Sequence, residues 1–397
     1  MLFTQGKIEV APAEIGYDEA RLEVLNQHFQ SIIDAGDIQC AMYCLSRHGK
    51  VFAHAALGKK SYRKDDATPA DPTDIRWYAS ITKVVCATAI MKLVEDGKLR
   101  LTTPIGEILP QLSTPPFNGI TILHLLSHTS GLHADDGCFE NKYQSNYWSM
   151  LKAAMKAHKK EDGEFDWISA TLGTIGSGMR TKPGEEWSYC SYGYMLLGAV
   201  IEKLTGVFSH DYIMENIAKP LGMADSCFDL TPELAKRSVV TAEWMEKDLQ
   251  PIIDGTIEPN DWRVYKIPST SGGMCGTVRD LTRFGDMFLG HTPSDARVLG
   301  RKAREGMFKK RIHDRPNFCW GAGGAPRSYC AGFDLRTDVE SLASDVTISH
   351  EGAGGAALYI DPVEDMSIAW FAVYREGSEW LPTAMYNTLN VVYSGLK

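Results

Sequence analysis

The chain has 397 residues, which is enough for a large core and for two domains or one elaborated domain. Its formal net charge is −9 and no run of Lys or Arg exceeds three residues, so a general nucleic-acid surface is excluded. Nine cysteines include no C-x-x-C pair and no zinc-like Cys/His grouping, and we expect reduced thiols, no metal and no cofactor. Without a signal peptide or an apolar run of roughly 18 residues, we expect a cytoplasmic protein with no membrane partner.

Hydrophobic periodicity predicts strands at both ends of the chain and helices between them. The first 75 residues predict a helix, a β-hairpin and a polar loop, over 17–33, 39–57 and 58–74. The patterns are then helical, with almost no strand alternation, as far as about residue 220. The C-terminal part predicts three strands and a final helix, over 346–350, 357–360, 367–374 and 379–393. This order indicates one sheet built from both ends of the chain.

Ser80 stands three residues before Lys83 at the predicted start of a helix. Residues three apart on a helix are surface neighbours, so the lysine can reach the serine hydroxyl. A serine needs such a partner, because its hydroxyl alone is a weak nucleophile at neutral pH. No other charge lies between Arg76 and Lys92, and an apolar setting favours the neutral amine, which is the form that acts as a base. The S-x-x-K pattern is common by chance, so its weight depends on companion motifs.

Two further stretches carry groups that fit the same chemistry. The loop over 183–191 places Tyr189 just before a helix, and a tyrosine beside a lysine ammonium can serve as a base. The stretch 350–355 follows an apolar strand, and its glycines let the backbone approach a neighbour closely. A backbone N–H from this stretch, together with the N–H of Ser80, would form an oxyanion hole.

Taken together, these motifs resemble the serine β-lactamase and penicillin-binding-protein superfamily, and within it the class C β-lactamases and family VIII carboxylesterases. The S-x-x-K, Y-x-N-like and H-x-G motifs are Ser80-Ile81-Thr82-Lys83, Tyr189-Cys190-Ser191 and His350-Glu351-Gly352. The resemblance also includes 125–132, 182–184 and 271–273, so it covers nearly the whole chain from about residue 20. An α/β-hydrolase would need a G-x-S-x-G motif, which the sequence lacks.

The resemblance implies an α/β (α+β) fold of the β-lactamase/transpeptidase type, with an antiparallel sheet flanked by helices and a mostly helical domain. We expect a discontinuous sheet domain, 1–75 with 266–397, and a helical domain, 76–265. The sheet would come from residues near 38–58 and 319–375, and the first and last helices would cover it. The active site would lie in the cleft between the domains.

The resemblance also implies roles for individual residues. Ser80 would attack the substrate carbonyl to form an acyl-enzyme, with Lys83 and Tyr189 sharing its proton. Which of these two groups is the general base stays open. The N–H groups of Ser80 and Ala353 would hold the oxyanion. The other substrate-binding residues would be His350, Gly352 and Ser191.

Two positions depart from the pattern of the family. Ser191 stands where the family usually has asparagine, so it cannot offer the carboxamide that binds the amide of a β-lactam. His350 replaces a lysine that would hold the substrate carboxylate. His350 could instead donate a hydrogen bond to a substrate carbonyl, help to orient Tyr189, or have a structural role. Both departures favour ester chemistry over β-lactam hydrolysis.

We therefore expect a serine hydrolase of the family VIII carboxylesterase type that acts on small-molecule esters, with weak or no β-lactam hydrolysis. The alternatives are a β-lactamase, a D-amino-acid peptidase or amidase, an acyltransferase, and a non-catalytic penicillin-binding protein that stays acylated. The aromatic residues that would line an apolar substrate pocket are Trp77, Tyr143, Trp148 and Trp262. The sequence leaves open the acyl chain length and whether the protein is a monomer or a homo-oligomer.

Overall fold

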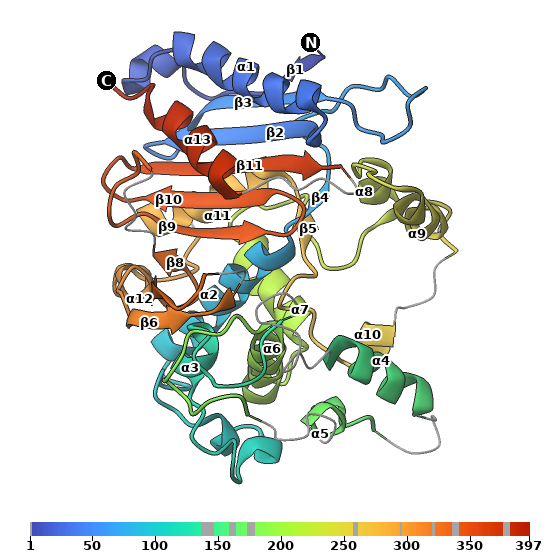
Figure 1. Ribbon diagram of the computed structural model, residues 1–397, viewed down its shortest axis with the longest axis vertical. Helices are drawn as coiled ribbons and strands as arrows, with labels where there is room; N and C mark the ends of the chain where they lie inside the picture. The colour runs from blue at the N-terminus through green and yellow to red at the C-terminus, as the bar shows by residue number, and fades with distance from the viewer. Residues whose placement is uncertain are drawn as a thin grey trace.

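One layer of the molecule is an antiparallel sheet that is covered by helices on both faces (Figure 1). The computed structural model describes residues 2–135, 147–158, 164–172, 179–256, 261–293, 296–319, 322–335, 341–375 and 382–397. Within them the sheet has nine strands in the order β1-β3-β2-β11-β10-β9-β8-β7-β6. Their bounds are Phe3–Gln5 (β1), Ile38–Arg47 (β2), Lys50–Gly58 (β3), Ile312–Asn317 (β6), Ala325–Tyr329 (β7), Asp334–Leu335 (β8), Ile348–Gly352 (β9), Ala356–Asp361 (β10) and Met366–Tyr374 (β11).

The central strands are buried on both faces, because their alternate side chains enter two different cores. Along β11, Ile368 and Trp370 pack into the core that α1 and α13 cover. The alternate residues Ala369 and Phe371 pack into the larger core that α2, α6 and α11 share. These helices are Ala20–Ala35 (α1), Thr82–Glu95 (α2), Ser191–Thr205 (α6), Val278–Leu289 (α11) and Pro382–Tyr393 (α13). This double burial explains why the sequence of β11 is almost continuously apolar.

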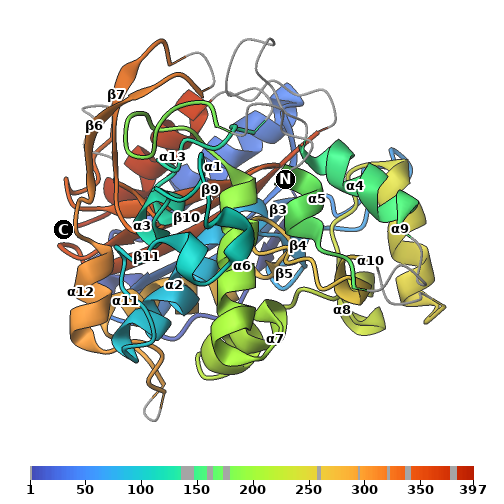
Figure 2. The same ribbon diagram turned by 90° about the horizontal axis from the view of Figure 1, so that it is seen from below.

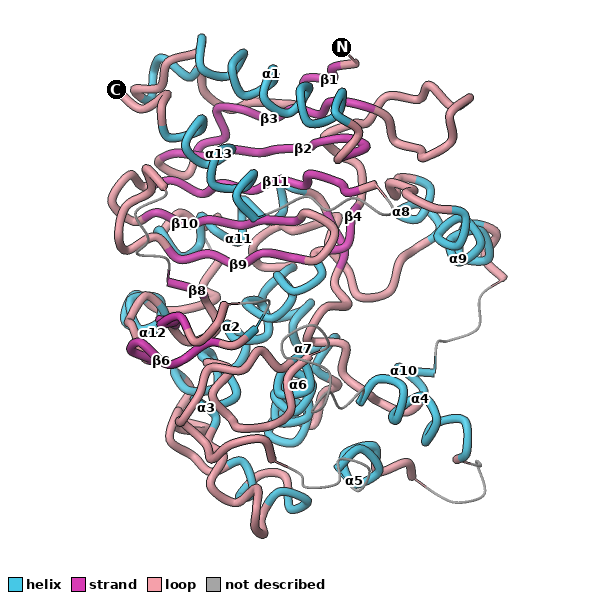
Figure 3. The backbone as a smooth tube through the Cα atoms, viewed as in Figure 1, coloured by secondary structure: helices cyan, strands magenta, loops and turns pink. Residues whose placement is uncertain are grey.

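The remaining helices gather mainly on one side of the sheet (Figure 3). They are Ile122–Leu126 (α3), Tyr147–Ala157 (α4), Trp167–Leu172 (α5), Ser209–Ile213 (α7), Pro232–Lys236 (α8), Glu243–Ile253 (α9), Asp261–Val264 (α10) and Arg301–Met307 (α12). Seen from below, α2 and α6 lie next to each other near the centre of the molecule (Figure 2). Among the described residues, no helix is long and apolar enough to cross a membrane.

The predicted fold class is confirmed, including strands from both ends of the chain and the first and last helices on one face. Two details differ. The sequence over 97–110 indicates a turn and a short amphipathic helix, but the structure has only a short 3₁₀ turn there, Ile105–Glu107. The sequence did not predict β1 or β6, and the middle of β6 is exposed, so this edge strand carries no apolar alternation. The start of the last helix at 379 lies outside the described residues. The domain boundaries at 75 and 265 stay a prediction.

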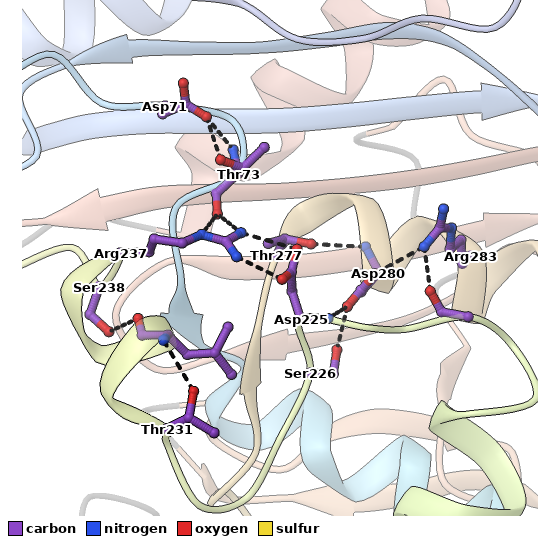
Figure 4. Close-up of polar contacts among 12 residues, drawn as sticks. Asp71, Thr73, Asp225, Ser226, Thr231, Arg237, Ser238, Thr277, Asp280 and Arg283 are labelled. Atoms are coloured by element: carbon purple, nitrogen blue, oxygen red, sulfur yellow. Dashed lines mark hydrogen bonds and ion pairs between the residues drawn. The ribbon is translucent and has the colours of Figure 1, made fainter. Parts of the chain in front are cut away.

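A polar network fixes the segment that leads to the S-x-x-K motif (Figure 4). The buried carboxylate of Asp280 accepts hydrogen bonds from the backbone N–H of Asp225, at 2.9 Å, and from Ser226 Oγ, at 3.0 Å. The Ser226 hydroxyl also lies 2.7 Å from the hydroxyl of Tyr78. The guanidinium of Arg237 binds the Asp225 carboxylate through two nitrogens. Because Tyr78 lies two residues before the candidate nucleophile, this network anchors the start of the site.

The network predicts a pH-dependent stability. Burial raises the pKa of Asp280 from its ordinary value of 3.8 to about 6. The folded state therefore holds the proton of Asp280 more tightly than the unfolded state does. The stability gained from this proton is fully present below about pH 4 and is lost as the pH rises through about 6. Urea unfolding should show that the wild type loses about 2 kcal/mol more than Asp280→Asn between pH 4 and pH 7.5.

The matched control is Asp34→Asn, which changes an exposed carboxylate on α1. Its stability should follow the wild type at both pH values. An Asp280→Asn curve parallel to the wild-type curve would contradict the raised pKa of the buried Asp280 carboxyl group.

Candidate active site

Ser80 and Lys83 are in hydrogen-bond contact at the start of α2. Lys83 is fully buried, and its Nζ lies 3.1 Å from Ser80 Oγ and 2.7 Å from the carbonyl oxygen of Ser271. Ser80 does not lie in the first turn of α2 as expected, but in a preceding 3₁₀ turn, η2 (Ala79–Ile81). Ala79, which precedes Ser80, has a φ of +46° in the left-handed region, so a right-handed helix cannot extend back through it.

Tyr189 lies over the same lysine. The centroid of its ring is 4.8 Å from Lys83 Nζ, and the ring of Tyr194 on α6 is 5.8 Å from the same atom. The Tyr194 hydroxyl donates to the carbonyl oxygen of Leu126 at 2.8 Å. The geometry therefore brings together the three residues Ser80, Lys83 and Tyr189 that the sequence singled out, and it adds Tyr194 as a structural neighbour.

The stretch that follows α3 holds Tyr189 in place, a role that the sequence did not predict. The ring centroid of His128 lies 4.4 Å from that of Tyr189. The carbonyl oxygen of His128 accepts from the N–H of Ser188 at 2.7 Å, and its Nδ1 accepts from the N–H of Cys190 at 3.1 Å. The Tyr189 carbonyl accepts from the N–H of Asp135 at 2.9 Å. His128 lies in the stretch 125–132, which is part of the family resemblance. The sequence therefore pointed to this stretch but indicated no role for His128.

His128 is a neutral imidazole. Its Nδ1 accepts a hydrogen bond from a backbone N–H, so that atom carries no proton. Burial, followed by the charge of Lys83, lowers the pKa of His128 well below its ordinary value. The residue therefore positions the tyrosine without adding a second cation beside the lysine.

The end of β9 packs against η2, which brings the H-x-G stretch to Ser80. A Cβ added to Gly352 would collide with the carbonyl oxygen of Tyr78 and would lie 3.2 Å from the Cβ of Ala79. Only glycine permits this approach. Ala353 follows directly and is exposed, so its N–H is at the junction of the strand and the turn. These contacts agree with the expectation that Ala353 lies close to Ser80.

His350 faces the same side as Gly352, because residues two apart on a strand share a face. Its ring centroid is 6.4 Å from that of Tyr189. Its Nδ1 lies 2.8 Å from the carbonyl oxygen of Glu351, which can only accept, so Nδ1 carries the proton. Burial, followed by the charge of Lys83, lowers the pKa of His350 to about 3, so the ring is neutral at pH 7.

Ser191 is engaged by a partner that the sequence did not indicate. Its backbone N–H donates to Asp135 Oδ1 at 2.7 Å, and its hydroxyl donates to Asp135 Oδ2 at 2.5 Å. Ser191 is the first residue of α6, where a carboxylate satisfies free N–H groups and favours the positive end of the helix dipole. The position where the family usually has asparagine thus ties α6 to the stretch that holds Tyr189.

The aromatic residues expected to line a substrate pocket are only partly described. The ring of Trp77 stacks on that of Trp244, with centroids 6.2 Å apart, and Trp244 is exposed. Tyr143 and the side chains of Trp148 and Trp262 lie outside the described part of the structure. Within that part, no group of three His, Cys, Asp or Glu side chains is placed to hold a metal ion.

Comparison with known proteins agrees with this geometry. A family model described as Beta-lactamase matches residues 25–380. Protein flp of Staphylococcus aureus (strain COL) is 29% identical over 215 residues, which are 53% of this chain and 39% of that protein. The chain therefore matches well under half the length of this curated relative.

Two solved structures share the fold over nearly all of both chains. A penicillin-binding protein homologue from Caulobacter crescentus has a TM-score of 0.70 and 17% identity, with coverage of 98% of this chain and 100% of that chain. A family VIII carboxylesterase has a TM-score of 0.69 and 15% identity, with the same coverage. At these identities the likeness shows the fold alone. Since the family model spans most of the sequence and includes the whole site, the chain belongs to the Beta-lactamase family, within the superfamily of serine β-lactamases and penicillin-binding proteins, most of whose members are serine hydrolases.

Proposed function

We propose that this protein is a carboxylesterase that hydrolyses small neutral esters through an acyl-enzyme on Ser80. The observation that carries the proposal is the buried contact of 3.1 Å between Lys83 Nζ and Ser80 Oγ. A neutral His350 at the position of the carboxylate-binding lysine of the family favours esters over β-lactams. A family VIII carboxylesterase shares the fold, so the same scaffold can carry ester hydrolysis.

The first half of the reaction is the transfer of an acyl group to Ser80. As Ser80 Oγ attacks the ester carbonyl carbon, its proton passes to Lys83 or, through it, to Tyr189. The carbonyl π-electrons move to oxygen, and the proton then goes to the leaving alkoxide as the C–O bond breaks. Ser271 helps because its carbonyl oxygen accepts one Lys83 N–H at 2.7 Å, which fixes the amine beside the nucleophile.

The negative charge that develops on the carbonyl oxygen needs fixed donors. The N–H groups of Ser80 and Ala353 are our candidates, because β9 packs directly against η2 at Gly352. A water molecule then attacks the acyl-enzyme and gives one proton to Lys83 or Tyr189. That proton returns to Ser80 Oγ as the bond between the serine and the acyl group breaks, and the carboxylic acid leaves. No cofactor is needed for either half.

The first prediction of this mechanism concerns Ser80. Ser80→Ala should lower kcat/KM for a nitrophenyl ester by about 10⁴-fold or more, because no other group supplies the nucleophile. Intact-mass analysis after treatment with a fluorophosphonate should show one adduct on the wild type and none on the variant. Ser31→Ala, an exposed change on α1, should label and turn over like the wild type. Full labelling of Ser80→Ala would remove Ser80 as the nucleophile.

The second prediction concerns the proton. Lys83→Met and Tyr189→Phe should each lower kcat/KM by several orders of magnitude, and the double variant should be little worse than either, because both groups handle one proton. Tyr194→Phe is the matched control, since that ring also lies near Lys83 but its hydroxyl is bound to a backbone carbonyl. Additive losses in the double variant would show that Lys83 and Tyr189 act independently.

The third prediction concerns the substrate. In a panel of nitrophenyl esters of rising chain length, nitrocefin and a D-alanyl peptide, short-chain esters should be the best substrates. A β-lactam brings an amide and a carboxylate, and each such group left unpaired costs about 1–3 kcal/mol. The kcat/KM for nitrocefin should therefore be lower than that for the best ester by about a hundredfold or more. Nitrocefin turnover equal to that of the best ester would instead favour a β-lactamase. A labelled adduct that persists without ester turnover would favour a non-catalytic penicillin-binding protein.

A further inference from the structure

The imidazole of His350 carries a hydrogen-bond acceptor that no described protein group satisfies. Only 6% of the residue is exposed, and its Nδ1–H is already donated to the carbonyl oxygen of Glu351 at 2.8 Å. In a neutral imidazole the other nitrogen, Nε2, then holds a lone pair and no proton. Nε2 is buried and has no hydrogen-bond partner. His350 therefore cannot donate a hydrogen bond to a substrate carbonyl, which is one of the roles that the sequence left open.

The surroundings of Nε2 restrict what can bind there. Lys83 and the guanidinium of Arg327 both act on the His350 ring as positive charges, and the carboxylate of Asp334, which binds Arg327, acts as a negative one. A cationic ligand would be repelled by the buried Lys83. A carboxylate would be attracted by these positive charges, but it has no proton to donate, and its oxygens would face the lone pair of Nε2. A neutral group with an O–H or N–H satisfies the acceptor without either conflict.

The position of His350 on β9 relates this acceptor to the scissile bond. His350 and Gly352 point to the same face, and two residues of a strand span roughly 7 Å. Gly352 contacts the turn that carries Ser80, so a substrate group bound to His350 would be a few bonds away from the reacting carbonyl. Such a group belongs to the substrate itself rather than to a remote second ligand.

We propose that His350 Nε2 selects esters that carry a neutral hydrogen-bond donor, a hydroxyl or an amide N–H, a few bonds from the scissile carbonyl. This inference rests on the proposed esterase function and narrows its substrate class to hydroxy esters and their amide analogues. The selection is the opposite of the one that a lysine makes at this position, because lysine is a donor only and a cation.

The experiment compares matched esters that differ only in the donor. The acyl-side pair is nitrophenyl 3-hydroxybutanoate and 3-methoxybutanoate, and the alcohol-side pair is glycerol monobutanoate and its dimethyl ether. The wild type should prefer the hydroxyl form of at least one pair by about tenfold in kcat/KM, the size of one hydrogen bond. Equal rates within both pairs, or a preference for the nitrophenyl hemisuccinate, would overturn the proposal.

Two variants separate recognition from a structural effect. His350→Phe should bring the hydroxy-to-methoxy ratio close to one, and His350→Lys should raise the preference for the hemisuccinate over the butanoate by about tenfold or more. Ser349→Ala is the control, because this neighbour on β9 points to the opposite face of the sheet. It should keep the wild-type ratio. An equal loss for all esters in His350→Phe would assign His350 to positioning of Tyr189.

Two readouts do not depend on turnover. Long-range ¹⁵N–¹H spectra of histidine-labelled protein should show His350, identified by its absence in His350→Phe, as the Nδ1–H tautomer from pH 6 to 8. A protonated Nε2 would overturn the proposal. On Ser80→Ala, the hydroxy ester should bind about tenfold more tightly than the methoxy ester. If the wild type hydrolyses no ester, the proposed function fails, and these two measurements still decide the role of His350.

Discussion

The complete burial of Lys83 is the constraint on which the site depends. An ammonium group removed from water is strongly destabilised unless fixed dipoles replace its hydration. Here the replacements come from three distant parts of the chain: Ser80 Oγ, the carbonyl oxygen of Ser271 and the ring face of Tyr189. Each of them also has a chemical use, as nucleophile, as a fixed acceptor and as a second proton carrier. The contacts that make the buried lysine tolerable are therefore the contacts that make it reactive.

A second constraint acts where the sheet meets the helices. The strand β9 must end against the backbone of η2, and the absence of a side chain at Gly352 permits that contact. On the other side, Ala79 adopts a left-handed φ of +46°, which turns the chain before α2 begins and presents Ser80 at the junction. Such backbone strain persists only where the surroundings fix it, and here the packing of β9 and the hydrogen bond between Tyr78 and Met274 do so.

The sequence predicted those parts of the fold and the site that depend on residues close together in the chain. The spacing of Ser80 and Lys83 and the apolar strands β2 and β11 could be read from the sequence, because helix and strand periodicities are properties of neighbouring residues. The edge strand β6 could not, since its exposed middle has no apolar alternation. Nor could the contact between Asp135 and Ser191, because the two residues lie 56 positions apart and no local pattern connects them. Motif resemblance identified the positions of His128 and His350, but the hydrogen bonds that fix their tautomers come from tertiary structure.

Those two tautomers are opposite, and the difference follows from the backbone group that each ring meets. Nδ1 of His128 faces an N–H and must accept, whereas Nδ1 of His350 faces a carbonyl oxygen and must donate. Both rings are neutral and both lie against Tyr189, at 4.4 and 6.4 Å between centroids. A second cation at either position would repel the positive charge that Lys83 gains when it takes the proton of Ser80. Neutral imidazoles on both sides leave the proton exchange to Ser80, Lys83 and Tyr189, and they leave the lone pair of His350 for the substrate.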